Sequence, residues 1–511
     1  MTNTSLGRLA GRGAVVNLVF GIGLQLLAVA QAVLIPRLLG ADAIGLFALA
    51  SAGVGIGLTL KGVDVAGKVV QERDVDLYTA YGVAMTLELG MATLMLLVMM
   101  GVAPILAAVY HRPQLWPVTS VLALTLFEAA LLSIPASIPY REMRFLKRNL
   151  FTAVGPLVTF VVTLALALSG AGIWSLVAGT VAGTAVAGAL LLRVSSIRPH
   201  FSWDGAVVRR FLRFGIPPWL GQMVTMVAGW GSVAVVAGTI GIAGLAYVNL
   251  AQGWAYMILQ LDAFMADAVF PALCAVRDSD DRLRRTFIVT NRLSIAWGAT
   301  VGLGLLLFAA PAVHLLLGPK WHPAVLLIQA SAVAVVINAI GYNWKNYYSA
   351  RGDTRPTLVT NLAASAWLAM VFIPLTLTLH LGGAAIAIVI MAVGGYIQRQ
   401  IYVSRFFPGL HLLPMVWREL CAVGAAGGVT GIARLAGWEP NGWASFVLQG
   451  TLFVALCVAA GWPLCGPLVR IVLGYVRSGS GAPTVESIES GPEPLRIPNR
   501  FAFPLGVAAD P

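Results

Sequence analysis

The stretch Gln25–Leu49, QLLAVAQAVLIPRLLGADAIGLFAL, holds two apolar runs joined by a short polar segment. Pro36, Arg37, Gly40 and Asp42 lie between the runs. Proline and Gly-Ala-Asp between apolar runs are typical of a tight turn, and an arginine there can keep its charge in water while its stem stays in hydrocarbon. The stretch therefore predicts the end of one membrane helix, a turn at the membrane surface and the start of the next helix.

The composition indicates an integral membrane protein. Apolar residues make up 59% of the 511 residues, charged residues only 11%, and the mean hydropathy is +0.85. Soluble domains contain about 25% charged residues. The net charge of +12 is attributed to basic residues at the cytoplasmic ends of helices, so no nucleic-acid partner is expected. The four cysteines have no metal-like spacing, and neither a metal nor a cofactor is expected.

Long apolar runs predict an all-α polytopic fold with about fourteen transmembrane helices, because a span needs about 20 apolar residues and helices satisfy every backbone polar group within lipid. The runs are continuous and lack the alternation of a β-barrel. They cover residues 14–35, 43–60, 80–108, 116–134, 150–169, 173–192, 214–238, 243–261, 287–309, 324–343, 357–379, 384–402, 414–436 and 444–466.

The distribution of Lys and Arg predicts the orientation. With a cytoplasmic N-terminus, only Arg37, Arg112, Lys320 and Arg434 fall on the outer side, and the other 29 of the 33 basic residues fall inside. Basic residues concentrate on the cytoplasmic side of membrane proteins, so both termini are predicted to be cytoplasmic. The Ser-, Gly- and Pro-rich residues 476–511 predict a disordered tail.

A weak internal repeat predicts two related halves. Gly45–Ala50 resembles Gly244–Ala251, about 200 residues later, and each segment opens a span. Six spans return the chain to the same side, so the halves would be six-helix lobes related by a parallel repeat, a known transporter design. The expected units are an N-terminal lobe (1–200), a C-terminal lobe (201–410), two additional helices (411–475) and the tail (476–511).

Five segments in order resemble the polysaccharide transporters, the Wzx-type flippases. They are Leu34–Gly40, Ile44–Phe47, Ile138–Phe145 (IPYREMRF), Leu317–Trp321 (LGPKW) and Tyr348–Asp353. REMRF and LGPKW are the more specific of these elements.

The resemblance covers roughly residues 8–410 and implies the multidrug/oligosaccharidyl-lipid/polysaccharide exporter superfamily. It implies a two-lobed flippase of the bacterial inner membrane. By alternating access, such proteins move an undecaprenyl-pyrophosphate repeat unit to the outer leaflet for lipopolysaccharide O-antigen, capsule or exopolysaccharide. Membrane lipids and polysaccharide polymerase or export machinery are the implied partners. The family's second-half turn usually has glycines five apart, whereas Gly241 and Gly244 are three apart here.

Cations near or within spans are candidate ligands for a pyrophosphate, and arginine suits phosphate through its planar fork. The candidates are Arg292, which lies inside the ninth span, Lys345, Arg37 and Lys61. Snorkelling to the membrane surface is the alternative for all four residues, and it is favoured for Lys61 and Arg37.

Other polar residues within spans are candidates because such residues are costly in lipid. Glu88 and Glu128 lie deep in the third and fourth spans and are candidates for proton coupling, with a neutral hydrogen-bonded glutamic acid as the alternative. Candidate sugar contacts are Gln25, Gln222, Asn338 and Trp344, with helix–helix hydrogen bonding as the alternative.

Two other functions remain open. An ion-coupled multidrug exporter would have the same architecture. A membrane enzyme such as a glycan polymerase would need a sizeable outer loop with catalytic residues, and the predicted outer loops are short. The sequence has no Walker motif, and no enzymatic activity is expected.

Overall fold

The computed structural model describes residues 3–62, 65–71, 75–141, 145–194, 197–275, 279–353, 355–438, 440 and 442–478. These residues form helices and short connections, without strands. In chain order the elements are α1 (Asn3–Leu38), α2 (Ala41–Lys61), α3 (Val65–Gln71), α4 (Leu77–Val109), α5 (Leu115–Arg141), α6 (Phe145–Leu168), α7 (Ile173–Val194), α8 (Gly205–Thr239), α9 (Ile242–Ala275), α10 (Asp280–Ala312), the π-helical η1 (Val313–Leu317), the 3-10 helix η2 (Pro319–Trp321), α11 (Ala324–Ala339), α12 (Trp344–Ala350), α13 (Arg355–Trp367), the π-helical η3 (Leu368–Phe372), α14 (Ile373–Phe406), α15 (Leu412–Leu435) and α16 (Trp443–Ser478).

The helices confirm a multi-pass membrane protein. Twelve helical runs in the described chain are long and apolar enough to cross a membrane, and α6 adds a shorter one, Ala153–Leu168. One of the twelve, Arg355–Phe406, has 52 residues. A helix of that length would extend about 78 Å, far beyond a hydrocarbon core of about 30 Å. His380, with φ 50°, divides it into two helices. The result is fourteen crossings, as predicted.

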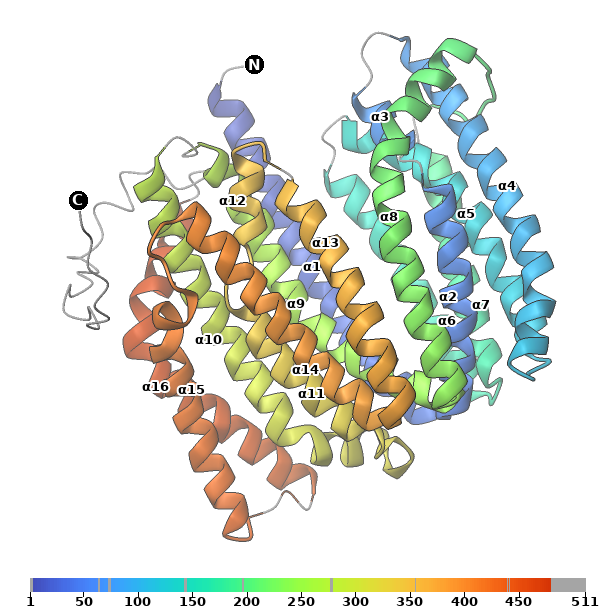
Figure 1. The fold of residues 1–511 in the computed structure, drawn as a ribbon. Helices are drawn as coiled ribbons and strands as arrows, with labels where there is room; N and C mark the ends of the chain where they lie inside the picture. Colours follow the sequence, from blue (N-terminus) through green and yellow to red (C-terminus); the bar gives the residue numbers. More distant parts are fainter. Residues whose placement is uncertain are drawn as a thin grey trace.

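The helices form two groups (Figure 1). The first contains α2 to α7 and the second contains α9 to α14. The first helix of each predicted half touches both groups: α1 packs on α6 and α9, and α8 packs on α2 and on α13 and α14. Val207 and Phe211, near the start of α8, are buried in the core of the first group. The division into lobes at residue 200 remains a prediction.

The additional helices pack on the second group. α15 and α16 both lie against α10. Phe308 of α10 meets Phe453 of α16 with ring centroids 6.0 Å apart. The helix α16 continues to Ser478, three residues beyond the predicted end of this unit. The remainder of the predicted tail lies outside the described residues, as do residues 142–144 of the REMRF motif.

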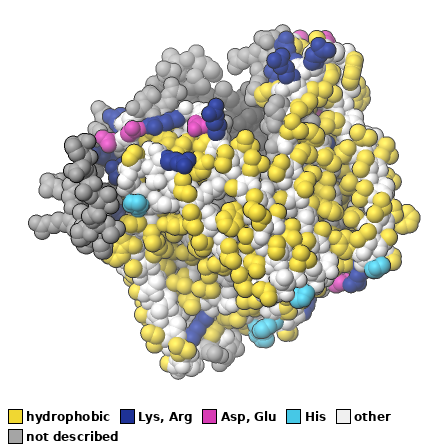
Figure 2. All heavy atoms as spheres, in the orientation of Figure 1, with side chains coloured by type: hydrophobic (Ala, Val, Ile, Leu, Met, Phe, Trp, Pro, Cys, Tyr) yellow, Lys and Arg dark blue, Asp and Glu magenta, His cyan; other side chains and the backbone are white. Residues whose placement is uncertain are grey.

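Charged side chains gather at the ends of the bundle. On the face drawn in Figure 2, Lys and Arg are concentrated at the upper end and hydrophobic side chains cover the middle. We call the end with the turns at Gly40, Gly170 and Lys320 the Gly40 end, and the opposite end the basic end. The assignment of the basic end to the cytoplasm remains a prediction.

Candidate functional site

A cavity of about 730 Å³ lies between α8 and the second group, where α9, α11, α12, α13, η3 and α14 supply the rest of its wall. Two cations, Lys345 and Arg399, line it, and no Asp or Glu is among the described residues of its wall. The other polar and aromatic side chains of the wall include Asn249, Gln252, Tyr256, Asn338, Trp344, Asn361 and Gln398.

The cavity forms where helices are interrupted or widened. Between α11 and α12 the helix breaks at residues 340–343, where Gly341 has φ 75°, a conformation that only glycine adopts readily. A π-helical turn, η3, supplies Leu368 and Phe372 to the wall. Interrupted membrane helices are typical of transporter sites, because irregular backbone is tolerated where it lines a cavity.

Both cations are held by amide side chains. The Nζ of Lys345 donates to Asn361 Oδ1 at 3.1 Å and lies 5.9 Å from the centre of the Trp344 ring. Arg399 donates through Nη1 to Asn338 Oδ1 at 3.1 Å and through Nη2 to the Ile337 carbonyl at 2.8 Å. Neutral partners position the two cations without cancelling their charge. The cavity is therefore suited to an anion with hydrogen-bonding groups.

Of the predicted site residues, Asn338, Trp344 and Lys345 line this cavity. Arg399 and Asn361 were missed. Arg399 lies inside the predicted span 384–402, three residues from its end, where a cation is readily interpreted as interfacial. Its position within a span was the signal that could have identified it.

Arg292 is engaged elsewhere. Its Nε donates to Glu419 Oε1 at 2.5 Å, and both side chains are largely buried, at 13% and 1% exposure. This ion pair joins α10 to α15. Arg292 is not among the residues that line the cavity.

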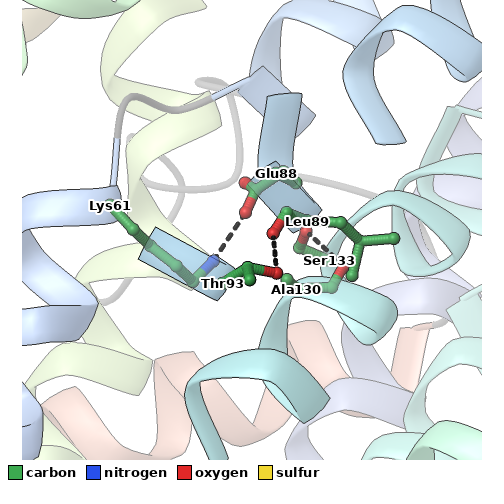
Figure 3. Close-up of polar contacts among 6 residues, drawn as sticks. All are labelled: Lys61, Glu88, Leu89, Thr93, Ala130 and Ser133. Carbon is green, nitrogen blue, oxygen red and sulfur yellow. Dashed lines mark hydrogen bonds and ion pairs between the residues drawn. The ribbon is translucent and has the colours of Figure 1, made fainter. Parts of the chain in front are cut away.

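Lys61 and Glu88 form a buried ion pair in the first group (Figure 3). Their Nζ and Oε2 atoms are 2.6 Å apart, and the side chains are 8% and 6% exposed. The expectation that Lys61 snorkels to the surface is therefore wrong, because its charge is neutralised inside the protein. Glu128 accepts a hydrogen bond from the Thr184 hydroxyl, which joins α5 to α7.

The glutamines of the two first helices differ in environment. Gln25 donates through Nε2 to the Met257 carbonyl at 3.1 Å and so joins α1 to α9. Gln222 of α8 is exposed. Neither lines the cavity.

The turn after α1 is bound by the segment around Trp321. The Nζ of Lys320 donates to the carbonyls of Arg37 and Leu39 at 2.9 and 2.7 Å. The indole of Trp321 donates to the Pro36 carbonyl at 2.9 Å. These carbonyls belong to the end of α1, where intrahelical donors are lacking. A cation at a helix C-terminus also interacts favourably with the helix dipole.

The arrangement is reciprocal. Arg37 donates through Nη1 to the Leu315 carbonyl at 3.2 Å, at the end of the helical run that contains α10. Each half thus places a cation on the helix end of the other half. We call these contacts of Pro36–Leu39 with Leu315–Trp321 the latch. It joins two of the family-like motifs at the Gly40 end.

Comparisons with known proteins agree with this fold. The family model "Polysaccharide biosynthesis protein" matches residues 34–326. The lipid II flippase MurJ, in an inward closed conformation, superposes with a TM-score of 0.70 at 13% identity, over 89% of this chain and 100% of that chain. An inward-facing multidrug resistance MATE family transporter of the MOP superfamily gives a TM-score of 0.58 at 16% identity, over 77% and 98% of the two chains. No curated protein matches the sequence.

Proposed function

Because the chain belongs to the polysaccharide biosynthesis protein family, we propose that it is a flippase that moves lipid-linked oligosaccharide from the inner to the outer leaflet. The substrate class would be an undecaprenyl-pyrophosphate repeat unit for exopolysaccharide, capsule or O-antigen. The protein would lie in the bacterial inner membrane with both termini in the cytoplasm, and would work by alternating access.

The observation that carries the proposal is the charge of the cavity. Lys345 and Arg399 line the cavity together with amide and aromatic side chains. A pyrophosphate can accept charge-assisted hydrogen bonds from the two cations, and sugar hydroxyls can pair with the amides of Asn249, Gln252 and Asn361. An ion-coupled multidrug exporter shares the fold, but a cavity with two cations is unsuited to cationic drugs.

The test is a flipping assay. The purified protein is reconstituted in liposomes with a fluorescent undecaprenyl-pyrophosphate oligosaccharide, and a membrane-impermeant quencher reports the outer-leaflet fraction over time. Charged hydrogen bonds contribute about 1.5–3 kcal/mol. Lys345→Met and Arg399→Gln are therefore each expected to weaken apparent affinity about 10- to 100-fold.

Arg112→Gln is the matched control, because Arg112 is an exposed cation paired with Asp42 at the Gly40 end. It should retain wild-type flipping. The proposal is overturned if the wild-type protein moves the lipid no faster than empty liposomes do. Efflux of ethidium by the same liposomes would instead favour the drug exporter.

A further inference from the structure

The two cations of the cavity lie on the side nearest the basic end. The part of α14 after His380 runs from the Gly40 end toward the basic end, and Arg399 lies about 28 Å along it. Lys345 is the second residue of α12, beyond the break that follows α11. The two charges are close enough to interact electrostatically. They therefore form one positive region at this side of the cavity.

Three uncharged side chains of α9 line the cavity on the side toward the Gly40 end. They are Asn249, Gln252 and Tyr256, and their spacing of three and four residues places them on one face of the helix. They lie about 10 to 21 Å along α9 from its first residue, Ile242. All three are exposed, Tyr256 to 62%. We call these three residues the α9 stripe.

The α9 stripe keeps hydrogen-bonding groups available to a ligand. Asn249 Nδ2 donates to the Leu245 carbonyl of its own helix at 2.9 Å, which leaves Asn249 Oδ1 as an acceptor. Neither Gln252 nor the Tyr256 hydroxyl is hydrogen-bonded to another described residue. Polar side chains within a membrane span are costly. Three of them on one face, none of which ties α9 to another helix, favour a surface that faces a ligand.

The charges of the cavity match those of a pyrophosphate alone. A pyrophosphate with a lipid on one phosphorus and a sugar on the other keeps one acidic oxygen on each phosphorus, and so carries two negative charges. Lys345 and Arg399 supply two positive charges, and no other Lys, Arg, Asp or Glu is among the described residues of the wall. A carboxylate or sulfate on a sugar beside the α9 stripe would leave water without meeting a counter-charge, which is unfavourable.

We propose that the α9 stripe selects an uncharged glycan, whose sugars carry hydroxyl and acetamido groups and no carboxylate or sulfate. This inference rests on the proposed function and adds the chemical class of the sugars. The pyrophosphate lies against Lys345 and Arg399, and the sugars extend along α9 toward the Gly40 end. Asn249 and Gln252 pair with sugar hydroxyl and acetamido groups, and the Tyr256 ring offers a flat apolar surface to the C–H face of a sugar.

The size of the cavity limits this selection to the sugars next to the pyrophosphate. About 730 Å³ is within the range of small-molecule sites and leaves no room for a long chain. Charge on the first sugar should therefore have the largest effect on transport.

The test compares two lipids in the liposome flipping assay. Both carry the same disaccharide with an uncharged fluorophore on undecaprenyl pyrophosphate. They differ only at C6 of the sugar attached to the pyrophosphate, which is a hydroxymethyl group in the neutral lipid and a carboxylate in the acidic lipid. Wild type is expected to move the neutral lipid at least about tenfold faster at limiting lipid concentration, because the carboxylate finds no counter-charge.

Substitutions at Gln252 test the residue directly. Gln252→Arg adds a third cation to the cavity and should accelerate the acidic lipid enough to abolish the preference. Gln252→Leu removes the amide and should slow the neutral lipid about 2- to 10-fold without accelerating the acidic one. Gln222→Arg is the matched control, because it adds the same charge at an exposed position of α8 that does not line the cavity. It should keep the wild-type preference.

The outcomes separate this inference from the proposed function. Equal rates for the two lipids in wild type would overturn the inference and leave the flippase proposal in place. An unchanged preference in a folded Gln252→Arg protein would overturn it as well. The wild-type comparison decides the matter even if that variant does not fold. If neither lipid moves faster than in empty liposomes, the proposed function fails, and this inference fails with it.

Discussion

Gly45 controls how closely α2 and α9 approach at the Gly40 end. A Cβ built on Gly45 would lie 1.9 Å from the carbonyl oxygen of Ile242, whereas real Cβ atoms essentially never come closer than 3.0 Å to another heavy atom. The two values differ by 1.1 Å, so Gly45→Ala must separate the helices by at least that amount. The clash is with backbone, which cannot rotate away as a flexible side chain can.

The expected magnitude is that of an overpacked contact, about 1–3 kcal/mol. In this structure α2 and α9 are in contact at the Gly40 end, and we call this arrangement the closed state of that end. Because packed interfaces tend to switch between discrete arrangements, we expect the cost to fall on the closed state. The ratio of open to closed molecules would rise about 5- to 150-fold.

The assay is a distance distribution between two spin labels at the Gly40 end. Ser169 lies between α6 and α7, His322 follows η2, and both are exposed. In a cysteine-free background, these two labelled positions should give one dominant distance in the wild type and a larger population of longer distances in Gly45→Ala.

Gly53→Ala is the matched control on the same helix. Its added Cβ would meet Leu106 Cδ1 at 3.5 Å, an ordinary contact, and the distribution should not change. If Gly45→Ala also retained the wild-type distribution, the close approach of α2 and α9 would not govern closure.

Three further predictions concern stability. Lys61→Met should lower the free energy of unfolding, measured by chemical unfolding in micelles, by about 3–5 kcal/mol, because Glu88 is left buried and unpaired. The double variant Lys61→Met/Glu88→Leu should recover most of this loss. Additive losses from the two substitutions would contradict the pairing. Burial lowers the pKa of Lys320 below its ordinary 10.5, so the unfolded chain binds that proton more tightly than the folded chain does. The free energy of unfolding should therefore rise with pH between the lowered pKa and 10.5. This rise should be absent in Lys320→Met. Gly341→Ala forces a side chain onto φ 75° and should cost about 1–2 kcal/mol and weaken glycan binding, whereas Gly253→Ala, in open space on the same cavity wall, should change stability little.

The membrane crossings were predictable because lipid permits few solutions for the backbone. Every apolar run of about 20 residues has to become a helix, so hydropathy gave the fourteen crossings and their approximate bounds. His380, where the helix is divided, lies in the gap between the predicted spans 357–379 and 384–402. A run of 52 residues is too long for one crossing, whatever its side chains are.

The partners of the intramembrane charges were not predictable. Lys61 ends an apolar run and is interpreted as interfacial from spacing alone, because its partner Glu88 lies on another helix. The position of Arg292 inside a span predicts a phosphate ligand, but Glu419, 127 residues later in the chain, pairs with it. Pairing between helices depends on which faces meet, and apolar sequences in lipid carry little information about faces. The cavity was partly foreseen through Asn338, Trp344 and Lys345, whereas Arg399 was not.

The latch has a consequence for building chimeras. Pro36–Leu39 and Leu315–Trp321 belong to different predicted halves, yet each supplies donors or acceptors to the other. A hybrid that joins the first half of one relative to the second half of another, at the linker near residue 200, would take the two segments of the latch from different parents. Such a hybrid should therefore fold only if one segment is also exchanged, so that both segments come from the same parent, even though about 280 residues separate them in the chain.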